Sequence, residues 1–162
     1  LRQDALADAA REVIDMGFAV GLHTAGPYPR RLHDMVERGL VDWVGLDIKA
    51  LPEHYAQVVG RPNSAPKAWQ CLHVLLEAAA DGGPDFEVRT TVVPGDVTAD
   101  DAVEVARRVH EAGARVYALQ QARGEGTTGR FAVVAPGWDA ACERMAERIE
   151  ALGWDRFTYR PA

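Results

Sequence analysis

The chain has 162 residues, of which 48% are hydrophobic and 26% are charged. These proportions are typical of a globular protein and exclude a disordered, collagen-like or disulfide-built chain. Its 18 Lys and Arg against 24 Asp and Glu give a formal net charge of −6, which argues against a nucleic-acid partner because phosphate backbones are bound mainly by basic residues. The longest apolar runs are far shorter than a bilayer requires, so we expect a cytoplasmic protein without a membrane partner.

Helices and strands are predicted to alternate along the first half of the chain. Apolar residues recur at helical spacing in some segments, while others are short and rich in branched residues. Gly and Pro separate the segments, as in the loop at 24–29. The expected elements are, in order, a helix at about 3–16, a strand at 18–23, a helix at 30–38, a strand at 43–49, a helical turn at 53–59 and a long helix around Ala68 to Ala79.

The second half continues the alternation. Thr98 and Asp101 have the spacing of a capping box at the start of a helix. A glycine-rich stretch at 124–129 lacks the Lys of a phosphate-binding P-loop and is a weak signal. The expected elements are a strand at 86–93, a helix from Thr98 to Gly113, a strand at 115–120, a helix at about 138–152 and a short strand near 157–159.

This order predicts an α/β fold with mainly parallel strands, because the connections are too long for hairpins. We interpret residues 1–162 as a single domain, since no linker or internal repeat divides them. The strands that begin near 18, 43, 86 and 115 are too few to close an eight-stranded barrel. A partial barrel or an open twisted sheet remains, and in either case ligands are expected at the carboxyl ends of the strands.

The strand at 43–49 has one polar face. Its even-numbered residues are Val, Leu and Ile, whereas its odd-numbered residues include Gly45, Asp47 and Lys49. A parallel strand that is covered on both sides is normally apolar on both faces, so the polar face needs a reason. In the strand at 18–23, Phe18, Val20 and Leu22 would likewise face helices and leave His23 opposite. With Thr24 just beyond it, His23 is predicted to lie near Asp47 and Lys49 around a ligand.

The next two strands add polar residues to the same region. Glu87 and Arg89 share one face of the strand at 86–93, and Gln121 and Arg123 follow the strand at 115–120. A carboxylate, a lysine and an arginine around one cavity suit a small zwitterion or a hydroxylated acid. The alternative is that Asp47, Lys49, Glu87 and Arg89 satisfy one another as a buried ion network. We favour the ligand site.

The remaining chemically reactive residues give no site. Cys71 and Cys142 lie 71 positions apart in predicted helices, so we expect small core residues and neither a disulfide framework nor a paired-cysteine zinc site. The other histidines lack the spacing of metal ligands; they are His33, His54, His73 and His110. We therefore assign no metal ligand, and we expect Trp138 and Trp154 to serve packing.

Four segments together carry a family resemblance. They are 23–27 (HTAGP), 41–50 (VDWVGLDIKA), 86–95 (FEVRTTVVPG) and 119–123 (LQQAR). In order and spacing they resemble the radical S-adenosylmethionine activating enzymes. The resemblance is closest to the anaerobic ribonucleoside-triphosphate reductase activating proteins, followed by the pyruvate formate-lyase activating enzymes, and it covers about residues 1–123.

The resemblance implies a partial (β/α) barrel that holds a four-iron four-sulfur cluster and S-adenosylmethionine. Reductive cleavage of the cofactor would yield a radical that takes a hydrogen atom from a glycine of a partner glycyl radical enzyme, such as anaerobic ribonucleotide reductase or pyruvate formate-lyase. Thr24, Asp47 and Lys49 would lie round the cofactor's methionine and ribose, and Lys49 or Arg89 would meet its carboxylate. The implied cofactor-binding set is His23, Thr24, Asp47, Lys49, Arg89, Gln121 and Arg123.

The sequence also departs from this family. Relatives usually read Asp-Thr-Asn-Gly where this chain has His23 to Gly26, and they hold the cluster with Cys-x-x-x-Cys-x-x-Cys, which this chain lacks. We therefore expect a carboxyl-terminal portion whose N-terminal strands and cluster segment are missing. Such a fragment would be inactive alone and could self-associate through an exposed sheet edge.

Two alternatives remain. The chain could be a binding or interaction module without a cluster, and the genomic sequence upstream of Leu1 would distinguish it from a truncated activating enzyme. Asp47-x-Lys49 is also similar to the Asp-x-Lys-x-x-Asp signature of orotidine-phosphate decarboxylase-like barrels. Pro52 stands where the second Asp of that signature is needed, so we rank this alternative lower.

Overall fold

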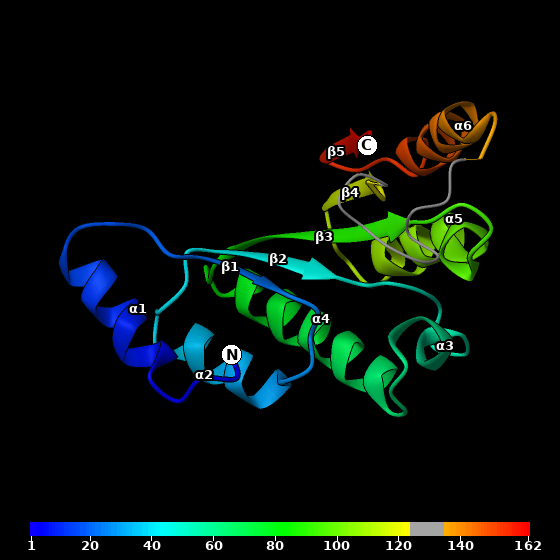
Figure 1. Cartoon of the computed structure of the whole chain (residues 1–162). Helices are drawn as coiled ribbons and strands as arrows, with labels where there is room; N and C mark the ends of the chain where they lie inside the picture. Colours follow the sequence, from blue (N-terminus) through cyan, green and yellow to red (C-terminus); the bar gives the residue numbers. More distant parts are fainter. Residues whose placement is uncertain (124–134) are drawn as a thin grey trace.

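The computed structural model describes residues 1–123 and 135–162, so the glycine-rich stretch at 124–129 lies outside the described residues. The described part is an α/β structure with six helices and a five-stranded, all-parallel sheet (Figure 1). The elements are α1 (Leu6–Asp15), β1 (Gly21–Thr24), α2 (Pro29–Glu37), β2 (Trp43–Asp47), α3 (Tyr55–Val59), α4 (Ser64–Ala80), β3 (Asp85–Val92), α5 (Val97–Glu111), β4 (Val116–Gln121), α6 (Trp138–Glu150) and β5 (Arg156–Arg160).

The strands lie side by side in the order in which they occur in the chain, β1-β2-β3-β4-β5, and every neighbouring pair is parallel. Each crossover therefore moves one strand further in the same direction. Because such crossovers are right-handed, they place their helices on the same face of the sheet. Figure 1 shows α2 and α4 along one side of β1, β2 and β3. In the described part of the chain, this singly wound order leaves the other face of the sheet without a crossover helix.

The core lies between that helical layer and the sheet. The sheet contributes the even-numbered apolar residues of β2, as the alternation predicted, together with Val88, Tyr117 and Leu119, all fully buried. The helices contribute Leu32, Leu72, Leu75, Val105 and Ile149. Trp138 and Trp154 pack against this core, as expected. In the part of the chain that the structure describes, no helix is long and apolar enough to cross a membrane.

Both cysteines are buried core residues, which confirms the prediction. Cys71 in α4 and Cys142 in α6 are 0% exposed and form no disulfide. Burial raises the pKa of the Cys71 thiol to about 12 and that of Cys142 to about 11, because desolvation disfavours the thiolate. Neither thiol is therefore a nucleophile at neutral pH.

Two local predictions were wrong. β1 begins at Gly21, and Phe18 is 66% exposed rather than packed against helices. The residue that caps α5 is Asp96, whose Oδ1 accepts from the Thr98 N–H at 3.0 Å, so Thr98 and Asp101 do not form a capping box. The Thr98 hydroxyl instead accepts from the Val93 N–H at 3.1 Å.

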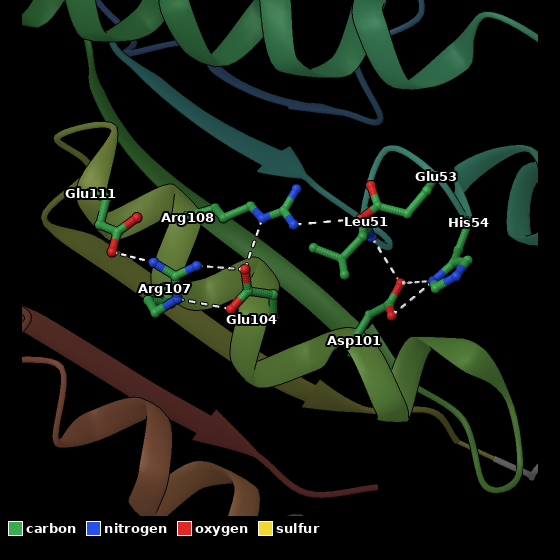
Figure 2. Close-up of polar contacts among 8 residues, drawn as sticks. All are labelled: Leu51, Glu53, His54, Asp101, Glu104, Arg107, Arg108 and Glu111. Atoms are coloured by element: carbon green, nitrogen blue, oxygen red, sulfur yellow. Dashed lines mark hydrogen bonds and ion pairs between the residues drawn. The ribbon is translucent and has the colours of Figure 1, made fainter.

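Asp101 instead joins α5 to the loop that follows β2 (Figure 2). Its Oδ2 accepts from the backbone N–H of Leu51 at 2.9 Å, and both of its oxygens lie 3.0 Å from Nδ1 of His54. Asp101 is only 4% exposed and Leu51 only 8%. This buried carboxylate therefore holds the segment that connects β2 to α3.

An exposed ion-pair network lies next along α5 (Figure 2). Glu104 accepts from Arg107 at 2.6 and 2.8 Å and from Arg108 at 2.9 Å. Hydrogen bonds from Arg107 and then Arg108 lower the pKa of Glu104 to about 2. Arg107 also pairs with Glu111, and Arg108 contacts Glu53 at 3.4 Å.

Candidate functional site

Charged side chains gather on the sheet face opposite the described crossover helices. The strand register aligns His23 of β1 with Gly45 of β2 and Glu87 of β3. Two residues further along β2 and β3, it aligns Asp47 with Arg89. Side chains two residues apart on a strand point to the same face. The alternation that predicted a polar face for the strand at 43–49 therefore places residues of three neighbouring strands together.

Arg89 is the centre of this group. Its Nε and Nη2 donate to Oδ1 of Asp47 at 3.0 and 2.7 Å, and its Nη1 lies 2.6 Å from Nδ1 of His23. The Arg89 side chain is 12% exposed and that of Asp47 is 26% exposed. Because the guanidinium is held by Asp47 of β2 and His23 of β1 and is largely buried, its orientation is fixed.

The contact between Nη1 of Arg89 and Nδ1 of His23 also sets the role of each His23 nitrogen. Arginine carries only N–H donors, so Nδ1 of His23 must accept, and the neutral imidazole then carries its proton on Nε2. The His23 ring meets the Trp43 ring edge to face, with centroids 5.2 Å apart. His23 is thereby held from two sides and presents an N–H donor at its other nitrogen.

Gly45 makes room for this arrangement. A Cβ at Gly45 would lie 2.8 Å from Nδ1 of His23, 2.8 Å from the Trp43 ring and 3.0 Å from Cζ of Arg89. Real Cβ atoms almost never approach other atoms below 3.0 Å, so any larger residue would displace these side chains. The glycine is therefore required by the close approach of His23 and Arg89 above it.

Lys49 lies just beyond the end of β2. Its Nζ is 3.4 Å from Oδ2 of Asp47, and its side chain is 33% exposed. That long contact is the one ion pair that the described residues give Lys49. The hydroxyl of Tyr55 donates to the Asp47 carbonyl at 3.5 Å, and burial raises the pKa of Tyr55 to about 12. Lys49 is thus the cation of the group with the most capacity for a further anionic partner.

We refer to His23, Asp47, Lys49 and Arg89 as the charged cluster. Glu87 is not part of it, because its carboxylate accepts from Nη2 of Arg160 in β5 at 2.9 and 3.1 Å. The alternative of one buried ion network among Asp47, Lys49, Glu87 and Arg89 is therefore correct only for Asp47, Lys49 and Arg89. Arg160 was not among the predicted site residues, because it lies one residue beyond the terminal strand expected near 157–159, which the structure extends to Arg160.

The other three predicted site residues lie elsewhere. The Thr24 hydroxyl accepts from the Gly26 N–H at 3.1 Å, and Thr24 aligns with Leu46 on the helix-facing side. Gln121 also lies on that side. Its Nε2 donates to Asp139 of α6 at 2.7 Å, and its Oε1 accepts from Tyr159 at 2.9 Å. The alternation already places Thr24 with Leu22, and Gln121 with Leu119, so this signal was available.

Arg123 lies exposed beyond the end of β4. The structure thus brings together four of the seven predicted residues, the four of the charged cluster. Within residues 1–123 and 135–162, no group of three or more His, Cys, Asp or Glu side chains is arranged to hold a metal ion.

One comparison with known proteins is informative. The chain is 26% identical over 121 residues to a protein of Methanocaldococcus jannaschii named "Putative glycyl-radical enzyme activating enzyme MJ1227". The match covers 75% of this chain and 50% of the relative, so the chain spans about half the length of the curated relative it matches. No protein-family model matches the chain.

Proposed function

We propose that this chain is the carboxyl-terminal portion of a radical S-adenosylmethionine activating enzyme, and that its sheet is part of a partial (β/α) barrel. The similarity to the archaeal protein named as an activating enzyme supports the family. The sequential order of parallel strands supports the barrel, because a doubly wound sheet reverses its strand order and a barrel does not. The partner would be a glycyl radical enzyme, of the anaerobic ribonucleotide reductase or pyruvate formate-lyase type.

The charged cluster carries this proposal. It lies on the face of the sheet that the described helices leave open, at the carboxyl ends of β1 and β2, where α/β folds bind ligands. Within it, Nζ of Lys49 is suited to a ligand carboxylate and Oδ2 of Asp47 to an ammonium group. Among the described residues, the 3.4 Å contact between these two atoms is the one polar contact that either of them makes. A carboxylate and an ammonium group are the two charged groups of an amino acid such as the methionine part of S-adenosylmethionine.

The remaining members of the cluster have different roles in the proposed site. Both edges of the Arg89 guanidinium are engaged by Asp47 and His23, so Arg89 orients these two residues and leaves the ligand carboxylate to Lys49. His23 offers its Nε2–H to a hydroxyl or ring nitrogen of the ligand. In the complete protein the bound cofactor would supply the radical chemistry, and the residues of this chain would bind and orient it.

The described residues do not fit an iron–sulfur cluster. Such clusters are usually held by several cysteine thiolates. Cys71 and Cys142, the two cysteines of the chain, are buried in α4 and α6. Under the proposal, the ligands of the iron–sulfur cluster belong to a part of the protein outside this sequence.

The test has two stages. Isothermal titration of S-adenosylmethionine into this chain should show binding, and Asp47→Asn or Lys49→Gln should weaken it by about tenfold, as expected for the loss of one charge-assisted hydrogen bond. Cys142→Ala is the control and should leave the affinity unchanged. If Cys142→Ala weakens binding more than the two cluster variants do, the site assignment is wrong.

The second stage uses the complete gene product that contains this sequence. Iron and sulfide are reconstituted under anaerobic conditions, and reductive cleavage of S-adenosylmethionine is measured by chromatography of the nucleoside product. Cleavage that falls in Lys49→Gln but not in Cys142→Ala supports the proposal. Absence of both cluster and cleavage would refute the activating enzyme, whatever the first stage gives.

A further inference from the structure

A cavity next to the charged cluster is lined by three basic side chains. It has a volume of about 620 Å³ and includes Tyr28, Lys49, Tyr55, Arg61, Ser64 and Lys67 in its lining. We call it the basic pocket. These residues come from the loop after β1, the segment after β2, α3, the loop between α3 and α4, and the first turn of α4, which meet on one side of the molecule (Figure 1). We propose that the basic pocket binds the phosphate groups of a small molecule.

The protein neutralises only part of the charge of the pocket, because Lys49 has its 3.4 Å contact with Asp47 while Arg61 and Lys67 have no acidic neighbour among the described residues. Its lining contains Lys49, Arg61 and Lys67 and no Asp or Glu, in a chain whose net charge is −6. In the described ranges, the side chains of Arg61 and Lys67 make no ion pair and no hydrogen bond. Like charges around one cavity repel each other, and an anion placed between them relieves this repulsion. The strongest complement is therefore a ligand with more than one negative charge.

Phosphate meets this requirement better than a single carboxylate does. A phosphate group carries a charge of roughly −1.5 to −2 at neutral pH and three strong acceptor oxygens. The guanidinium of Arg61 matches two of these oxygens, and each lysine adds a point charge. Ser64 is the first residue of α4, so the positive end of that helix dipole adds to the same potential.

The rest of the lining suits an organic group. Tyr55 is only 2% exposed, and Pro27, Val59 and Pro62 add apolar surface to the wall. Ligand sites typically combine an apolar wall with a few placed polar groups in this way. The shared chemistry is the phosphate, which either a phosphate ester or inorganic pyrophosphate can supply.

This inference is separable from the proposed function. Lys49 belongs to both the basic pocket and the charged cluster, whereas Arg61 and Lys67 belong to the pocket alone. Variants of Arg61 and Lys67 therefore test the pocket while the cluster stays intact.

The experiment is isothermal titration of this chain with pyrophosphate, ADP and adenosine, without a divalent metal. Pyrophosphate and ADP should bind, and adenosine should bind at least about tenfold more weakly than ADP. The double variant Arg61→Gln, Lys67→Gln should weaken phosphate binding by at least about tenfold. The control Arg144→Gln, Arg148→Gln removes the same charge from the exposed face of α6 and should leave the affinity unchanged.

The outcomes distinguish a phosphate ester from inorganic pyrophosphate, and the basic pocket from the S-adenosylmethionine site proposed at the charged cluster. Tighter binding of ADP than of pyrophosphate identifies a phosphate ester as the occupant, and equal affinities identify the inorganic anion. Failure of both to bind at millimolar concentration, equal binding of adenosine and ADP, or equal weakening by the control variant would each overturn the proposal. S-adenosylmethionine binding should be unchanged in Arg61→Gln, Lys67→Gln; loss of both ligands together would show that the pocket is not a separate site.

Discussion

Replacement of Asp101 by Ala is expected to destabilise the protein by about 3 kcal/mol, because it removes a buried acceptor that joins two segments 50 residues apart. Asp101 lies in α5 and Leu51 in the loop after β2 (Figure 2). In the variant the buried Leu51 N–H loses its partner and has little access to water. The loop also leads from Lys49 to Tyr55, so its release affects the charged cluster.

The magnitude follows from the separate contacts. A hydrogen bond to a charged group is worth about 1.5–3 kcal/mol, and a buried donor left unsatisfied costs about 1–3 kcal/mol. These two effects overlap, since the lost bond and the unsatisfied Leu51 N–H are the same event, so they are not added in full. The contact with His54 adds less, because that side chain is 43% exposed and solvent screens it. Asp101→Asn retains one carbonyl acceptor for Leu51 and should cost only about 1 kcal/mol.

The assay is equilibrium unfolding in urea, followed by tryptophan fluorescence and extrapolated to water. Asp100→Ala is the matched control, because it removes the same residue type from the neighbouring, exposed position of α5. Its effect should stay below about 1 kcal/mol, the scale of a helix-dipole contribution. A loss in Asp101→Ala no larger than that in Asp100→Ala would refute the reasoning, as would equal losses in Asp101→Ala and Asp101→Asn.

Three further predictions follow from the geometry. Gly45→Ala should weaken S-adenosylmethionine binding in titrations and destabilise the fold by about 1–3 kcal/mol, because its Cβ would crowd His23 and Arg89. Gly21→Ala is the control and should do neither, since a Cβ there lies 3.8 Å from its nearest atom. Similar effects of the two variants would show that crowding at Gly45 is not the cause. The pKa of Glu104 is lowered to about 2 from an ordinary 4.5, so the unfolded chain binds more protons than the folded chain between these pH values. The contribution of Glu104 to the free energy of unfolding is therefore present above pH 4.5 and lost as the pH falls towards 2. Melting temperatures of Glu104→Gln should therefore depend less steeply on pH in that window, and an unchanged slope would count against the pairing. Cys71 and Cys142 should resist iodoacetamide at pH 8 in the folded protein and react in denaturant; labelling of the native protein would show that burial does not protect them.

Much of the candidate site could be predicted because alternation along a strand is a local property. Asp47 and Arg89 are each placed on the polar face by their own strand sequences, and His23 is placed in the same way. The same rule applied strictly would have removed Thr24 and Gln121, which the alternation assigns to the helix-facing side. Their polar character drew them into the prediction, but their hydrogen bonds lie away from the charged cluster.

The sequence by itself determined the order of helices and strands, the parallel sheet and the face on which each strand carries its charges. These features follow from periods of two and 3.6 residues and from Gly and Pro, which act over a few positions. Only the tertiary structure decided which charges touch. Glu87 pairs with Arg160 across 73 residues, and Asp101 holds Leu51 across 50. Such contacts depend on the alignment of strands and on how helices pack against loops, and no local pattern specifies either.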